Sequence, residues 1–78
     1  MASLKVSNGY EQSLAGLGKI RQFERLSEKR ITKCVREALR RQHRINGVKV
    51  SCSAHFLNSR WHGVCWIGGQ EFNYIISA

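Results

Sequence analysis

The spacing of apolar residues changes at Gly47, and this change constrains the fold more than any other feature of the chain. Between residues 31 and 45, apolar residues recur at intervals of three and four, the period of an amphipathic helix. From 48 to 56 they alternate with polar residues, the period of a half-buried strand. Seventy-eight residues suffice for a single core. We therefore predict one domain, residues 1–78, that is helical before Gly47 and a sheet after it.

Two helices are predicted in the first half. The first spans about 18–26, where apolar residues recur every third position, and the second spans 28–46. Ser27 is a suitable N-cap for the second helix, and Asn46-Gly47 is a natural stop. Asn8-Gly9 favours a two-residue hairpin turn, but its flanks are short and hold few apolar residues. We therefore expect a loose arm before the first helix.

Three strands are predicted in the second half, at 48–56, 61–67 and 70–76. Asn58-Ser59-Arg60 and Gly68-Gly69 provide the turns between them. The resulting fold class is α+β, with two N-terminal helices packed on a three-stranded antiparallel β-meander in the order ααβββ. Trp61 and Trp66 fall on opposite faces of their strand, so at least one of them belongs in the core.

The predicted helix 28–46 carries a strongly cationic face. The chain has 13 Lys and Arg residues against five acids, a formal charge of +8, which predicts attraction to polyanions. More than half of these cations lie opposite the apolar arc of this helix, where like charges four residues apart repel each other mildly. They are Lys29, Arg30, Lys33, Arg36, Arg40, Arg41 and Arg44. A row of such cations is suited to neutralising a phosphate backbone.

The function expected from this pattern is noncatalytic nucleic-acid binding through the helix, with Arg60 and Trp61 as a second contact patch. The alternative is a small phage or mobile-element inhibitor or adaptor, anti-CRISPR-like, whose basic face docks on an acidic protein or a nucleoprotein complex of the host. Either would act in the cytoplasm, since no apolar run long enough for a membrane span or a secretory signal is present. The edge of a three-stranded sheet would also allow homodimerisation.

Catalytic and metal chemistry have weaker support in the sequence. The five acids form no acid/base pair, so we expect no enzyme activity and no cofactor. Cys52, His55, His62 and Cys65 form a mirrored C-x-x-H and H-x-x-C pair with the ligand types that zinc prefers. Residues three apart on a strand face opposite sides, so two half-buried cysteines and two surface histidines are favoured and no metal ligand is assigned. The sequence leaves the zinc alternative open.

Overall fold

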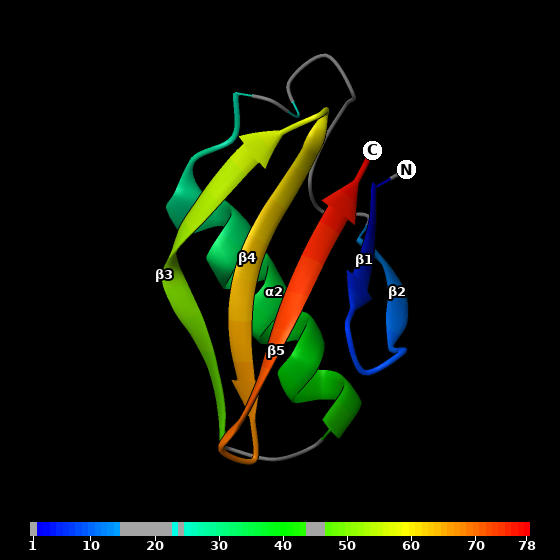
Figure 1. Cartoon of the computed structure of the whole chain (residues 1–78), viewed down its shortest axis with the longest axis vertical. Coiled ribbons are helices and arrows are strands. Elements are labelled where there is room, and N and C mark those ends of the chain that lie inside the picture. Colours follow the sequence, from blue (N-terminus) through cyan, green and yellow to red (C-terminus); the bar gives the residue numbers. More distant parts are fainter. Residues whose placement is uncertain (1, 15–22, 24, 44–46) are drawn as a thin grey trace.

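A computed structural model describes residues 2–14, 23, 25–43 and 47–78, with only the backbone described for His43 and Cys52. Its elements in chain order are β1 (Ala2–Val6), β2 (Glu11–Leu14), α2 (Glu28–His43), β3 (Val48–Leu57), β4 (Arg60–Ile67) and β5 (Gln70–Ser77). The strands form one antiparallel sheet in the order β2-β1-β5-β4-β3. In Figure 1 the helix α2 lies across one face of this sheet. The sheet face turned away from α2 is called the outer face below.

The predicted ααβββ order is wrong, because the N-terminal segment forms two strands of the sheet. Gly9 has a φ of +94°, and its N–H donates to the Val6 carbonyl (2.9 Å), while the Val6 N–H donates to the Tyr10 carbonyl (2.9 Å). This is a three-residue hairpin loop with glycine in the left-handed position. The short strand β1 is stabilised by pairing with β5, from Ser3 opposite Ser77 to Val6 opposite Tyr74. The expected loose arm is therefore a hairpin.

The part of the chain that the structure describes holds one helix, α2, instead of the two predicted. The predicted first helix, 18–26, falls mostly outside the described residues. Within that segment Phe23 is buried, and its ring packs edge-on against Phe56 of β3 with centroids 5.9 Å apart. The segment before α2 is therefore held against the sheet at this point.

The helix α2 begins where the sequence predicts. The Arg30 N–H donates to the Ser27 hydroxyl (3.2 Å), and the Ile31 N–H donates to the Ser27 carbonyl (3.1 Å), so Ser27 is the N-cap. The apolar arc packs mainly against β3, and its members Ile31, Val35, Ala38 and Leu39 are fully buried. The described helix ends at His43, and residues 44–46 of the predicted helix lie outside the described part.

The three C-terminal strands form the predicted meander. Asn58 and Ser59, with φ of 52° and 63°, connect β3 to β4, and Gly68 and Gly69, with φ of 60° and 82°, connect β4 to β5. Both two-residue turns have the positive φ angles that match the twist of a hairpin. The β3–β4 register shifts between Val50 and Ala54, so residues 51–53 bulge opposite Val64.

Candidate nucleic-acid interface

The face of α2 that points away from the sheet carries a stripe of four cations. Lys29, Lys33 and Arg40 are exposed and Arg36 is half-buried. Steps of four, three and four residues keep these side chains on one side of a helix. At a rise of 1.5 Å per residue, the stripe runs for about 16 Å along the helix axis. The burial of the opposite arc fixes the direction in which this stripe points.

Two further cations flank the stripe on the side of Glu37. Arg30 and Arg41 are exposed there, and the Arg41 Nε donates to the Glu37 carbonyl (3.4 Å). A hollow of about 430 Å³ follows this flank and is lined by Lys29, Arg30, Lys33, Cys34 and Glu37. Arg44, which the sequence also assigned to this face, lies outside the described residues.

The stripe is electropositive because most of its cations are not paired with carboxylates in the part of the chain that the structure describes. Within the described residues, Lys29, Lys33 and Arg40 form no ion pair with a carboxylate, while Lys5 on the hairpin pairs with Glu11 at 3.4 Å. The apolar surroundings of Cys34 raise the pKa of its thiol, against the opposing effect of the Arg30 charge. Cys34 therefore stays a neutral thiol at neutral pH and adds no negative charge to the hollow.

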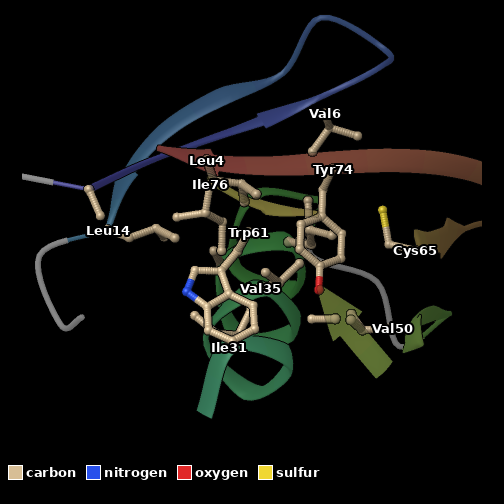
Figure 2. Close-up of a cluster of buried hydrophobic side chains, with 14 of the residues drawn as sticks. Leu4, Val6, Leu14, Ile31, Val35, Val50, Trp61, Cys65, Tyr74 and Ile76 are labelled. Carbon is tan, nitrogen blue, oxygen red and sulfur yellow. The ribbon is translucent and has the colours of Figure 1, made fainter. Parts of the chain in front are cut away.

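The structure places Trp61 in the core, which removes it from the predicted second contact patch. Its side chain is only 5% exposed, and its indole N–H donates to the Phe23 carbonyl (2.9 Å). The ring also packs against Phe56, with centroids 5.5 Å apart (tilted), and Figure 2 shows it among the buried side chains beside Ile31. Because both its ring and its N–H are engaged inside the protein, Trp61 is unavailable for stacking on a base.

Arg60 is exposed, but the structure does not bring it together with the helix cations. It lies one residue before Trp61 on β4, and successive strand residues face opposite sides of the sheet. Since Trp61 faces α2, Arg60 belongs to the outer face. The predicted patch of Arg60 with Trp61 is therefore divided between the two sides of the sheet.

Trp66 and Lys49 are an accessible aromatic and a cation that were not among the predicted site residues. They sit directly opposite each other on β4 and β3, on the outer face, with Trp66 half-buried and Lys49 exposed. The alternation along β4 separates Trp61 from Trp66, but only the position of α2 decides which of the two is covered.

The four residues of the mirrored Cys/His pattern do not gather at one point. Cys65 is fully buried on the side of α2, where burial raises the pKa of its thiol to about 11. His55 and His62 pair across β3 and β4 on the outer face, and the side chain of Cys52 is not among those described. No group of three or more His, Cys, Asp or Glu side chains suited to a metal ion occurs in the described part of the chain.

Comparison of the chain with protein-family models, with curated proteins and with solved structures finds no match. No helix in the described residues combines the length and apolar character that crossing a membrane requires.

Proposed function

We propose that this protein binds nucleic acid, with the exposed face of α2 against the phosphate backbone. The observation that carries the proposal is the stripe of Lys29, Lys33, Arg36 and Arg40 on the side of α2 away from the sheet. Condensed counterions released from a phosphate backbone provide the free energy for such contacts.

The cost of the stripe to the helix supports a ligand of opposite charge. Lys29 with Lys33, and Arg36 with Arg40, are like-charge pairs four residues apart, which destabilise an isolated helix by a few tenths of a kcal/mol each. A face that only needs to be hydrated can intersperse acids and bases and avoid this repulsion. A row of phosphates converts the repulsion into attraction at every position.

The sheet supports the proposal by holding the stripe in a fixed place. Ile31, Val35 and Leu39 are completely buried against it, so α2 cannot rotate without exposing its apolar arc. The backbone that carries the cations is therefore already ordered, and only their side chains lose freedom when a ligand binds.

The test compares two doubly substituted proteins with the same net charge. Lys33→Gln/Arg40→Gln removes two cations from the stripe, and Lys5→Gln/Arg60→Gln removes two from the outer face. Fluorescence anisotropy with labelled duplex DNA and structured RNA, at about 50 and 200 mM salt, measures the affinity of each. We expect the stripe variant to lose most of the affinity for the preferred ligand and the outer-face variant to keep it.

Equal losses in the two variants would show that net charge, and not the α2 stripe, governs binding. Weak binding of the unsubstituted protein to every nucleic acid would overturn the proposal. That second result would direct attention to an acidic protein surface, the partner of the anti-defence inhibitor or adaptor.

A further inference from the structure

An open pocket lies at one corner of the sheet, beside the start of β3 and the β4–β5 turn. Its volume is about 750 Å³, and it is lined by Gly47, Lys49, Val50, Ser51, Trp66 and Gly69. Figure 1 shows the start of β3, the β4–β5 turn and the last turn of α2 at the same end of the molecule. The volume falls in the range of sites that hold small organic ligands.

The chemistry of the pocket comes from Lys49 and Trp66. They face each other across β3 and β4, so an ammonium group and an indole ring share one short stretch of surface. The space around Gly47 and Gly69 is open, because a Cβ built on either would meet nothing within 4 Å. Trp66 is half-buried, so the sheet orients its ring while part of it stays accessible.

We propose that this pocket binds an unpaired base of a single-stranded nucleic acid, which stacks on Trp66 while Lys49 contacts the adjoining phosphate. The inference rests on the proposed function and deepens it by naming a strand with unpaired bases as the ligand. Stacking on aromatic side chains beside a basic groove is the general mode of single-strand binding.

The pocket lies close to the C-terminal end of α2 along the chain. Gly47 follows His43, the last residue of α2, by four positions, and four residues span at most about 14 Å. The last turns of α2 hold Arg40 and Arg41. The stripe and the Trp66 ring face opposite sides of the molecule, so a strand bound at both must pass around the sheet edge formed by β3.

The two sides of the pocket carry opposite charges. Trp66 lies between Lys49 on β3 and Glu71 on β5, each directly opposite it. The Glu71 carboxylate repels a phosphate and the Lys49 ammonium attracts one. The phosphate of the bound nucleotide therefore belongs on the β3 side of the indole ring.

The experiment titrates the full chain with an oligothymidylate and, in parallel, with a duplex, and follows tryptophan emission and anisotropy. Trp66→Leu removes the stacking surface and keeps an apolar side chain, while Trp66→Phe keeps an aromatic ring. We expect Trp66→Leu to weaken single-strand binding about 5- to 150-fold, which corresponds to the loss of one stacked base. Trp66→Phe should weaken it less, and neither should change duplex affinity.

Three further readouts isolate the pocket. Single-strand binding should quench tryptophan emission in the unsubstituted protein but not in Trp66→Phe, because the remaining Trp61 is 5% exposed and engaged with Phe23. Lys49→Gln should weaken single-strand binding, and Glu71→Gln should leave it unchanged or strengthen it. Circular dichroism checks that each variant is folded.

The outcomes separate this inference from the proposed function. The proposal for the pocket alone would be overturned if duplex binding depends on the α2 stripe while single-strand binding is unchanged in Trp66→Leu. Failure of the protein to bind either ligand would overturn both. Single-strand binding that is weakened in Trp66→Leu and retained in Trp66→Phe would support the pocket.

Discussion

Tyr74 is the largest fully buried side chain among the described residues, and its surroundings explain a glycine on the neighbouring strand. Figure 2 shows the ring pointing from β5 into the core. Gly63 lies opposite Tyr74 on β4, and the ring occupies the space that a side chain at position 63 would fill. The buried hydroxyl has no hydrogen-bond partner within the described residues. Three predictions at the residue scale follow from the buried ring and its hydroxyl.

Tyr74→Phe should raise the free energy of unfolding, measured by urea denaturation, by about 1 kcal/mol near pH 7. The substitution removes a polar atom that was desolvated without compensation, and such an atom costs about 1–3 kcal/mol. A clear loss of stability in Tyr74→Phe would contradict the unpaired hydroxyl.

The same hydroxyl predicts a loss of stability at alkaline pH. Burial raises the pKa of Tyr74 from 10.0 to about 12, and the thiol of Cys65 adds to this rise. Above pH 10 the folded state holds a proton that the unfolded state releases. The free energy of unfolding is therefore unaffected by this group below pH 10 and falls as the pH rises toward 12. Urea denaturation at a series of pH values should show a shallower decline in Tyr74→Phe. Identical declines in the two proteins would contradict the assignment.

Gly63→Ala should destabilise the fold by about 1–3 kcal/mol, the usual cost of overpacking a core. A Cβ at position 63 would lie far inside van der Waals contact with Cζ of Tyr74. Urea denaturation measures the loss, and the control repeats it in a Tyr74→Leu background, where the ring is absent. If Gly63→Ala is as costly in both backgrounds, the ring is not the cause.

At the scale of elements, the sequence predicts what local spacing determines and misses what distant pairing determines. The apolar period of α2, its Ser27 cap and the Gly68-Gly69 turn are local signals, and the structure confirms all three. The alternation of Ala2, Leu4 and Val6 was also visible, but a strand this short is stable only beside β5, some seventy residues along the chain. No local sequence pattern predicts that β1 pairs with β5.

Part of the candidate site could likewise be predicted from local spacing, and part could not. The helical period alone places Lys29, Lys33, Arg36 and Arg40 on one face, and the structure keeps them together there. The choice of tryptophan failed, because strand alternation shows only that the two indoles face opposite sides. Which side α2 covers is a property of the assembled fold.

Ser27→Ala should lower the free energy of unfolding by about 1 kcal/mol, because the first turn of α2 loses its side-chain acceptor. Ser27→Asp is the matched control, since its carboxylate can accept the same Arg30 N–H and also suits the positive end of the helix dipole. The urea midpoints of the two variants should differ. Equal midpoints for Ser27→Ala, Ser27→Asp and the unsubstituted protein would contradict a capping role.

At the scale of the whole molecule, the two faces of the sheet have separate roles in the proposed function. The face under α2 holds the core and fixes the direction of the stripe. The outer face carries the Lys49–Trp66 pocket close to the end of the helix where Arg40 and Arg41 lie. Binding of a phosphate backbone and binding of an unpaired base are therefore predicted to be separable by substitution.

The most direct test of the central claim is the salt dependence of duplex binding, measured as the slope of log affinity against log salt concentration. Each phosphate contact contributes about 0.9 to this slope on duplex DNA. Lys29→Gln/Lys33→Gln/Arg40→Gln should therefore lower the slope by up to about 2.7 relative to the unsubstituted protein. The Lys5→Gln/Arg60→Gln control should leave it unchanged. A slope that stays the same in the stripe variant, or falls equally per charge in the control, would contradict phosphate binding by α2.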